Sequence, residues 1–227
     1  MNNNPFYKDP LKPTPGRRFV NGLQVLAGLG LLLLISWFTI LGQNQVDGPS
    51  MRPNYYTGEF LILNRIPQLM GPNLATTLGL EYKIGEVIVF TKPGFPDLLK
   101  RVIAVPGDRI ALKKGKYFVN GQVVKEDYIP EKLYTNGGTF LQENGEEIIV
   151  PEGHVFASGD NRPESSDSRA IDIGFVKREW IKGKVILRIW PFDRFSFIPL
   201  GGTTLVDESD FDFSKADPNF RNSPTPE

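Results

Sequence analysis

Three short segments of the sequence have residue types that could support a chemical reaction, and the first of them contains a serine. Ser50 lies in residues 47–53 (DGPSMRP), between two prolines that prevent a continuous helix. We therefore expect its hydroxyl and its backbone N–H to be held in a fixed, extended conformation. A serine held in this way is a candidate nucleophile. A proline-rich linker that contains a serine is the alternative interpretation.

The second segment, residues 100–108 (KRVIAVPGD), places a lysine in an apolar run. If the run is a strand, alternation puts Lys100, Val102 and Ala104 on one face. An amine on an apolar face loses hydration, which lowers its pKa and favours the neutral form that a general base needs. The alternative is a lysine on an edge strand whose ammonium group reaches past the apolar surface to water.

The third segment, residues 159–169 (GDNRPESSDSR), contains three acids, two arginines and three serines. A polar surface loop is one interpretation of this composition. A buried network of hydrogen bonds explains the dense pairing of arginine with aspartate better.

Composition excludes several other kinds of site. The 227 residues include no cysteine, which excludes disulfides, thiol nucleophiles and thiolate metal sites. His154 is the only histidine, so a zinc site built on two or three imidazoles cannot form, and a Ser-His-Asp triad would require this residue. The 26 basic and 26 acidic residues cancel, so we expect no nucleic-acid partner. A hydrophobic content of 40% is enough for a folded core.

The N-terminal part of the chain has the pattern of a membrane anchor. Residues 1–19 carry four basic residues and one acid, and their prolines indicate a flexible basic tail. Residues 20–41 carry no charge, and as a helix they would extend ~33 Å, enough to cross a bilayer core about 30 Å thick. A buried core helix would carry charges on one face, and a cleavable signal would have a shorter apolar region that ends in small residues. The positive flank places the N-terminus in the cytoplasm and residues 42–204 on the extracytoplasmic side.

The pattern of residues 42–204 indicates a mainly β domain. Short β-branched or aromatic runs, separated by Gly, Pro and Asn, predict strands at 59–64, 86–91, 98–105, 117–119, 122–124 and 184–189. Asn120-Gly121 favours a type I′ hairpin turn between two of these strands. We expect no helix of ten or more residues after the anchor. Residues 205–227 are acidic with few aliphatic side chains, and we expect a disordered tail there.

Four boxes taken together resemble the bacterial type I signal peptidases. They are GPSMRP at 48–53, GEVIVF at 85–90, KRVIAVPGD at 100–108 and GDNRPESSDSR at 159–169, in the order and spacing of that family. The basic tail and apolar segment stand where the family has a membrane anchor, and the resemblance covers about residues 17–200. It implies a mostly antiparallel β domain with one N-terminal transmembrane helix and a large apolar surface that sits on the membrane. The strand pattern agrees with this fold.

The resemblance also implies roles for individual residues. Ser50 matches the family's nucleophile and Lys100 its general base. Ser165 matches the serine that hydrogen-bonds to the lysine amine and orients it, and Asp167 and Arg169 match a supporting ion pair. The rigid turn that holds these groups is matched by Asp160, Asn161 and Arg162.

One position departs from the best-known members of the family, which have a serine two residues before the nucleophile. The hydroxyl of that serine helps to form the oxyanion hole, whereas this chain has Gly48. The oxyanion hole must then rest on the backbone N–H of Ser50, and loss of one such donor usually lowers a rate by about 10²–10³-fold. His154 matches no catalytic position, and Lys100 already supplies the base.

The implied activity is that of a membrane-bound serine endopeptidase that removes signal peptides from secreted preproteins, without a metal or an organic cofactor. The substrate binds extended, so the side chains at the first and third positions before the scissile bond face the enzyme. The resemblance implies that apolar residues of moderate bulk line these two subsites: Val46, Met51, Leu61, Val89 and Leu99. Such subsites favour small side chains, as in Ala-x-Ala. The expected partners are preproteins and the lipid bilayer, and we expect a monomer.

Two other functions stay open. A self-cleaving regulator of the SOS-response repressor kind shares the serine-lysine chemistry, but it carries a DNA-binding region where this chain has residues 1–41. A non-catalytic membrane-tethered β domain would require Ser50, Lys100 and Ser165 to coexist by inheritance only, and a serine-reactive probe would distinguish it. Residues 67–83 mix Leu, Met, Pro and Gly, and they fit either a loop that contacts the membrane or an ordinary surface loop.

Overall fold

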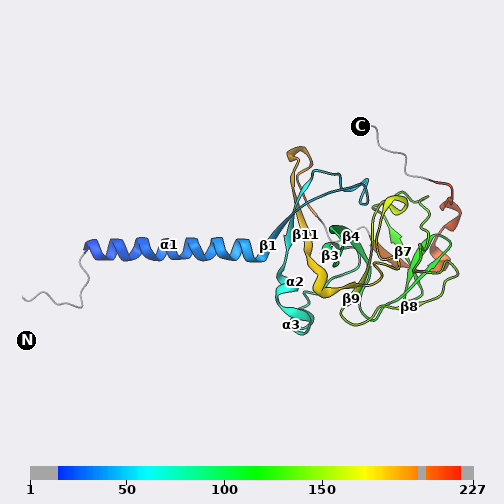
Figure 1. The fold of residues 1–227 in the computed structure, drawn as a ribbon, viewed down its shortest axis with the longest axis horizontal. Helices are drawn as coiled ribbons and strands as arrows, with labels where there is room; N and C mark the ends of the chain where they lie inside the picture. Colours follow the sequence, from blue (N-terminus) through cyan, green and yellow to red (C-terminus); the bar gives the residue numbers. More distant parts are fainter. Residues whose placement is uncertain (1–14, 199–202, 221–227) are drawn as a thin grey trace, which may run out of the picture. The chain divides into compact units, whose positions relative to one another are not determined.

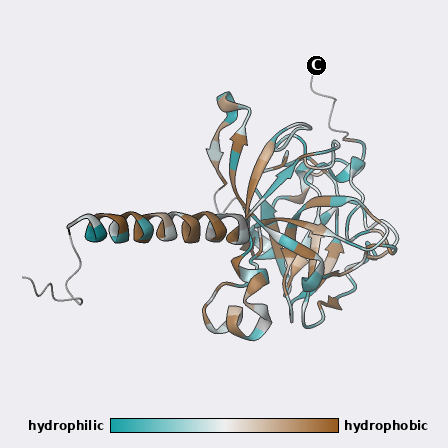
Figure 2. Ribbon diagram, turned by 60° about the vertical axis from the view of Figure 1, so that its left-hand side comes forward, coloured by the Kyte–Doolittle hydropathy of each residue, from teal (hydrophilic) through white to brown (hydrophobic). Residues whose placement is uncertain are grey.

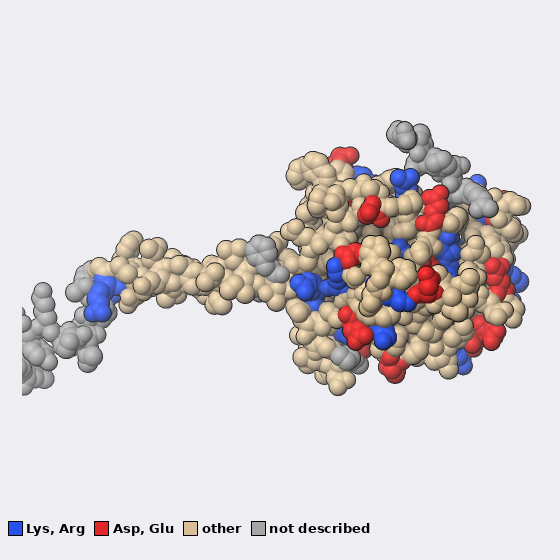
Figure 3. Space-filling view, in the orientation of Figure 1, with Lys and Arg blue, Asp and Glu red and all other residues tan. Residues whose placement is uncertain are grey.

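The charge-free segment near the N-terminus forms helix α1 (Pro15–Ile40) (Figure 1). The structure is a computed structural model, and it describes residues 15–198 and 203–220. The chain separates into two units, residues 1–40 and 41–227. Within α1, Gly16–Ile35 is long and apolar enough to cross a membrane, and none of this stretch is buried. The helix is hydrophobic along most of its length (Figure 2). Its described charges, Arg17 and Arg18, lie near its N-terminal end (Figure 3).

Helix α1 begins earlier than the sequence pattern predicts. Pro15 stands at its first position, where proline is well tolerated because the N–H that it lacks would have no partner there. Residues 15–19 are therefore helical rather than part of a flexible tail, and the rest of the expected tail, residues 1–14, lies outside the described residues. The helix ends at Ile40, so Leu41 belongs to strand β1 (Leu41–Gln45) and not to the helix.

The chain from residue 41 forms two sheets, and every pairing between their strands is antiparallel. The larger sheet has the spatial order β1, β2 (Phe60–Asn64), β11 (Ile181–Trp190), β3 (Val87–Thr91), β4 (Asp97–Ala104), β9 (His154–Ser158) and β10 (Val176–Lys177), and β12 (Ser196–Phe197) pairs with β11. The smaller sheet has the order β13 (Thr203–Val206), β7 (Gln122–Glu126), β6 (Lys116–Val119), β5 (Arg109–Lys113) and β8 (Ile148–Ile149). The expected mainly β, antiparallel fold is confirmed.

The helices of this unit are short. Among its described residues two α-helices occur, α2 (Ile66–Leu69) and α3 (Gly71–Thr77). Single turns of 3₁₀ helix occur at η1 (Arg162–Glu164), η2 (Arg178–Trp180), η3 (Phe192–Arg194), η4 (Glu208–Asp210) and η5 (Phe213–Lys215). Within residues 41–198 and 203–220 there is thus no helix of ten or more residues, as the sequence predicts.

The strands predicted from β-branched runs are present to within a few residues, and the turn chemistry explains one connection directly. Asn120 and Gly121 join β6 to β7 with φ values of 53° and 80°. Both values are positive, as a type I′ turn requires. One buried cluster then joins the two sheets: Ile103 and Phe156 from the larger sheet pack with Ile110 and Tyr117 from the smaller.

Two features of the larger sheet position the candidate chemistry. The loop between β1 and β2 carries Ser50. Strands β4 and β9 pair with Arg101 opposite Ser158, so the 159–169 segment begins directly after the strand that neighbours Lys100. Segments far apart in the sequence therefore meet at one place.

The expectation of a disordered tail over residues 205–227 is wrong for the part that the structure describes. Strand β13 pairs with β7, and Phe211 and Phe213 pack against Phe118 on the outside of the smaller sheet. Glu208 forms an ion pair with Lys113 at 2.8 Å. Aromatic side chains spaced among the acids supply the apolar contacts that overall composition hides. Residues 221–227 lie outside the described residues.

An aromatic hairpin connects β11 to β12. Trp190, Phe192, Phe195 and Phe197 are between 46% and 76% exposed, and their rings contact one another in two edge-to-face pairs. Figure 1 shows this hairpin projecting from the sheet beyond the end of β11. Its rings form an exposed apolar surface, a feature that the resemblance implies.

Candidate active site

Ser50 is held in tight turns within the loop between β1 and β2. The Arg52 N–H donates to the Pro49 carbonyl oxygen at 3.0 Å, and the Tyr55 N–H donates to the Met51 carbonyl oxygen at 3.0 Å. The expected extended conformation is therefore wrong for this loop. Prolines prevent a helix here, but they are well suited to turns.

Asn161 fastens this loop to the turn that follows β9. Its N–H donates to the Ser50 carbonyl oxygen at 3.0 Å, and its Nδ2 donates to the Pro49 carbonyl oxygen at 3.1 Å. Nδ2 also donates to Glu164 Oε2 at 3.1 Å, which fixes the orientation of the amide. Within the described part of the chain, the Ser50 N–H makes no hydrogen bond. It is therefore not committed to an acceptor within these residues.

Lys100 reaches the Ser50 side chain from β4. Its Nζ donates to Ser50 Oγ at 2.8 Å and to the Leu99 carbonyl oxygen at 2.9 Å. The lysine is only 2% exposed, so the alternative of an ammonium group that reaches water is wrong. The structure thus brings together the two residues that sequence analysis proposes as nucleophile and base.

The surroundings of Lys100 favour its neutral form. Burial is the largest cause, and it lowers the pKa of the amine from 10.5 to about 8. Asp167 and Asp160 act in the opposite direction because negative charge favours the ammonium form, and Arg169 lowers the pKa further. The amine is therefore partly neutral near neutral pH, where a free lysine is almost entirely charged.

Asp167 is fully buried and surrounded by donors. Its carboxylate accepts hydrogen bonds from Arg169 Nε and Nη2, both at 2.8 Å, from the Gly159 N–H at 2.8 Å and from Ser165 Oγ at 2.7 Å. Burial raises the pKa of Asp167, but Arg169 and these hydrogen bonds outweigh burial and hold the pKa below its usual value. The expected Asp167–Arg169 ion pair is present and buried.

Ser165 lies next to the candidate dyad, but its contact differs from the expected one. Its hydroxyl donates to Asp167, and among the described residues it makes no recorded hydrogen bond with Lys100. A Cβ at Gly159 would clash with Ser165 Oγ and with the Ser50 carbonyl oxygen. These two groups therefore approach Gly159 closely, and glycine is required there.

A second buried ion pair supports the turn from β4. Arg101 donates to Asp160 through Nε at 2.9 Å and Nη2 at 2.7 Å, and Asn54 Nδ2 donates to the same carboxylate at 2.8 Å. Asn54 follows Ser50 by one turn of the loop, so Asp160 connects that loop to β4. Neither Arg101 nor Asn54 is predicted as a site residue from the sequence. Arg101 stands beside Lys100 in the same box, and alternation gave it the opposite face, yet both faces of β4 are buried.

Arg162 holds the other side of the same turn. Its Nε donates to the Gly159 carbonyl oxygen at 2.9 Å, and its guanidinium group forms an ion pair with Glu126 and donates to Thr135 Oγ1 at 2.6 Å. Glu126, at the end of β7, was also missed, because no local pattern indicates that it faces an arginine in another segment. Asp160, Asn161 and Arg162 therefore anchor the turn to three different parts of the chain.

The residues expected to line the subsites share one buried apolar cluster. It contains Val46, Met51, Leu61, Val89 and Leu99, together with Tyr55, Leu63, Val87 and Val185. Met51 directly follows Ser50, and Leu99 directly precedes Lys100. The cluster therefore adjoins the candidate dyad at both of its members.

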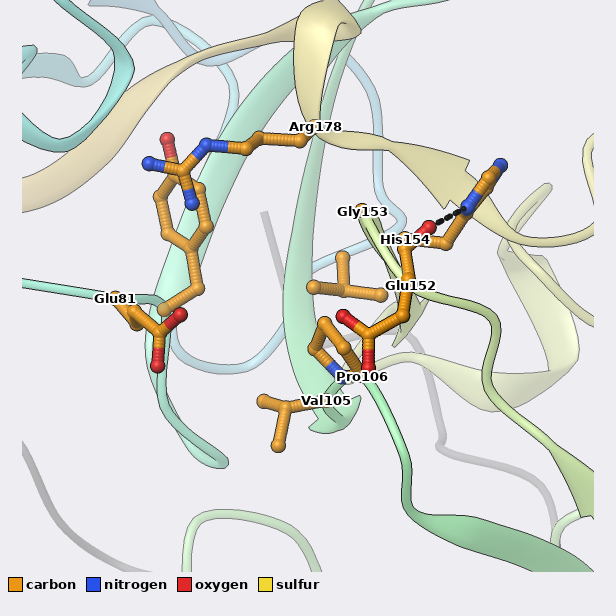
Figure 4. A pocket seen from close by; sticks show the side chains of 9 residues that line it. Glu81, Val105, Pro106, Glu152, Gly153, His154 and Arg178 are labelled. Atoms are coloured by element: carbon orange, nitrogen blue, oxygen red, sulfur yellow. Dashed lines mark hydrogen bonds between the residues drawn. The ribbon is translucent and has the colours of Figure 1, made fainter. Parts of the chain in front are cut away.

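His154 lies away from these groups, at the start of β9. Its Nδ1 is 2.9 Å from the Glu152 carbonyl oxygen, the contact marked in Figure 4. His154 lines a cavity of about 290 Å³ that Tyr82 and Arg178 also line, and neither Ser50 nor Lys100 is among the lining residues. The structure does not bring His154 together with Ser50.

Comparison with known proteins connects this geometry to a family. The model of the family described as signal peptidase, peptidase S26, matches residues 19–190 of this chain. Signal peptidase I of Bacillus caldolyticus is 40% identical over 158 residues, which are 67% of this chain and 81% of that protein. Signal peptidase IB of Staphylococcus aureus strain MRSA252 is 31% identical over 185 residues, which are 77% of this chain and 91% of that protein. A solved signal peptidase I from Enterococcus faecalis V583 matches at 28% identity with a TM-score of 0.37, over 46% of this chain and 96% of that one.

The family match includes Ser50, Lys100 and the whole of the 159–169 segment. Members of the family are membrane-associated serine endopeptidases that remove signal peptides from preproteins. Because the family model covers most of the sequence, and because two relatives are more than 30% identical over most of their length, the chain belongs to the signal peptidase family, peptidase S26.

Proposed function

We propose that this signal peptidase cleaves preproteins with a Ser50–Lys100 dyad. The observation that carries the proposal is the 2.8 Å contact between Ser50 Oγ and Lys100 Nζ at a site where burial lowers the pKa of the amine. A neutral amine at this distance can accept the hydroxyl proton, and a charged one cannot.

The reaction has two halves. Neutral Lys100 takes the Ser50 proton as Ser50 Oγ attacks the scissile carbonyl carbon, and the Ser50 N–H donates to the oxygen that becomes negative. When the intermediate collapses, the lysine gives its proton to the departing amine, and an ester links the signal peptide to Ser50. Lys100 then takes a proton from water, the resulting hydroxide attacks the ester, and Ser50 recovers a proton as the signal peptide leaves with a new carboxylate.

The supporting residues act on position and charge. Ser165 Oγ donates to Asp167, and a hydroxyl that donates still has lone pairs, so we propose that Ser165 accepts a hydrogen bond from the Lys100 ammonium group that forms during the reaction. The buried Asp167–Arg169 pair is close to neutral as a unit. Asp167 therefore stabilises the transient ammonium ion without holding Lys100 permanently charged.

We further propose that α1 anchors the enzyme with its N-terminus in the cytoplasm and residues 41–227 outside. The basic residues before the apolar stretch support this orientation. The exposed rings of the β11–β12 hairpin are of a kind suited to the interface between lipid and water. Anchoring raises the effective concentration of enzyme and substrate, because the apolar segment of a signal peptide occupies the same thin layer.

The test of this function is cleavage of a purified preprotein. Detergent-solubilised enzyme should cut a preprotein that carries Ala-x-Ala at a single bond, and Ser50→Ala and Lys100→Ala enzymes should leave it intact. Mass spectrometry of the products identifies the bond. Cleavage by the Ser50→Ala enzyme would contradict the proposal, and a stable intact preprotein with all three enzymes would favour a non-catalytic β domain.

The pH profile of kcat/KM should follow the Lys100 amine. Because the base must be neutral, we expect the rate to rise with pH and to level off above about pH 8, the pKa of Lys100 in the folded enzyme. The free energy of unfolding should also rise between pH 8 and 10.5, since the unfolded chain binds the proton in that window and the folded chain does not. Lys100→Met should remove this rise in stability. A rate that increases only near pH 10.5 would mean that Lys100 is solvated, contrary to the structure.

Gly48 permits a test of the oxyanion hole. Its φ is +84°, a conformation that costs a residue with a side chain about 1–2 kcal/mol, and a Cβ there would meet no atom within 4 Å. Gly48→Ala and Gly48→Ser should therefore be destabilised to the same extent, and only the serine adds a donor. We expect kcat of Gly48→Ser to exceed that of Gly48→Ala by about 10-fold or more at similar KM. Equal kcat values would show that water or another group already donates to the oxyanion in place of the missing serine hydroxyl.

A further inference from the structure

The segment between β2 and β3 carries leucines that the fold leaves exposed. Residues 66–80 contain no charged side chain. Nevertheless Leu69, Leu74 and Leu78 are 51%, 48% and 52% exposed. Three half-exposed leucines in a charge-free stretch are unusual on a surface that faces only water.

Leu74 and Leu78 are exposed on one face of a regular helical segment, not in an irregular loop. The Leu78 N–H donates to the Leu74 carbonyl oxygen at 3.0 Å, so the helical turn of α3 continues to Leu78, and side chains four residues apart share a face. Ala75, on another face of the same helix, is fully buried. Gly79, with φ of +64°, and the bond from the Leu80 N–H to the Ala75 carbonyl oxygen at 2.8 Å end the helix in a defined way.

The segment is also fastened to the domain. Arg178, which Figure 4 shows at the edge of the cavity, donates through Nη2 to the Pro67 carbonyl oxygen at 2.5 Å and to the Gly71 carbonyl oxygen at 3.4 Å. Its guanidinium group also lies 5.4 Å from the centre of the Tyr82 ring. The leucines are therefore held in place at both ends of the segment.

The register of the sheet places this segment beside the point where the chain enters the domain. Leu41, the first residue after α1, pairs with Asn64. Asn64 Oδ1 accepts from the Ile66 N–H at 2.9 Å, so α2 starts next to Leu41. A Cβ on Gly42 would lie 3.1 Å from Arg65 Cδ. The aliphatic part of the Arg65 side chain therefore packs beside Gly42, where the chain enters the domain.

We propose that residues 66–80 insert the side chains of Leu69, Leu74 and Leu78 into the bilayer interface, as a lipid contact separate from α1. This inference rests on the proposed membrane anchor, which brings Leu41 to the bilayer surface. A lipid partner is favoured because the segment carries exposed leucines without any charge and begins next to Leu41, the first residue after the proposed anchor. Arg65, at its start, provides the cation that anionic headgroups attract.

The absence of cysteine from the sequence permits a direct experiment. In the full chain with Ser50→Ala, single substitutions Leu74→Cys and Leu78→Cys are labelled with an environment-sensitive fluorophore and reconstituted into phosphatidylglycerol and phosphatidylethanolamine liposomes. Asn73→Cys tests a neighbouring exposed position of α3, and Ile149→Cys, at a site 62% exposed in the smaller sheet, is the matched control. Nitroxide-labelled lipids serve as the quencher.

Labels at positions 74 and 78 should lose about half of their emission to nitroxide lipids, the label at 73 less, and the label at 149 almost none. Labels at 74 and 78 that respond no more than the label at 149 would overturn this inference alone, and the segment would then face water or a protein. A chain that stays out of the liposomes would overturn the anchor and this inference together. The readout needs no cleavage, so it does not depend on the proposed dyad.

Discussion

Replacement of Lys100 by arginine is expected to lower kcat/KM for a preprotein by about 10⁴-fold or more. Arginine keeps the positive charge and the hydrogen-bond donors, but it cannot release its proton at any working pH. Lys100→Met should cause the same loss, because methionine keeps the apolar stem and removes the amine. Single-turnover assays with excess enzyme measure the loss without interference from product release.

A second buried lysine of this chain supplies the matched control. Lys116 is 5% exposed, and burial lowers its pKa too, but its Nζ donates to the carbonyl oxygens of Glu131 and Leu133 at 2.8 and 3.0 Å. Lys116→Arg should therefore resemble the unmodified enzyme in kcat/KM, even if it loses stability. Activity of Lys100→Arg comparable to that of Lys116→Arg would mean that Lys100 does not act as a base.

The second large effect concerns the substrate. We propose that the apolar cluster of Val46, Met51, Leu61, Val89 and Leu99 borders the subsites for small side chains. Phe, Lys or Asp at the position before the scissile bond should then lower cleavage of an Ala-x-Ala preprotein by about 10³-fold, because a large ring would have to displace close-packed apolar side chains and burial of an unpaired charge costs several kcal/mol. The same residues at the intervening position should have little effect, because an extended chain directs that side chain away from the enzyme.

A scan of one preprotein through these three positions, with kcat/KM for each variant, measures this pattern. The intervening position is the internal control, since the substrate keeps its length and composition. Efficient cleavage after Phe or Lys would contradict both the subsites and the proposed preference for small residues.

The candidate site could be proposed from the sequence because its residues are concentrated in short motifs. Ser50 and Lys100 stand 50 residues apart, and each lies in a motif that can be recognised without a structure. The strands were predictable for a similar reason, because β-branched runs and the Asn120-Gly121 turn are local signals.

Contacts between distant segments were not predictable in the same way. Arg101 and Asp160 are separated by 59 residues and Glu126 and Arg162 by 36, and periodicity carries no information about such pairs. The placement of Phe211 and Phe213 on the smaller sheet was missed because the acids around them dominate the composition. The sequence does not indicate which acceptor the Ser165 hydroxyl binds, and the structure shows that it is Asp167.

The dyad is tested most directly by acylation with a serine-reactive probe, followed by intact-mass and peptide mass spectrometry. We expect a single adduct on Ser50, formed at a rate that rises with pH to a plateau above about pH 8, and no adduct on the Ser50→Ala enzyme. Lys100→Met should leave Ser50 unmodified on the same timescale, whereas Lys116→Arg should not change the rate. An adduct on another residue, or an unchanged rate of Ser50 acylation in Lys100→Met, would contradict the serine-lysine mechanism.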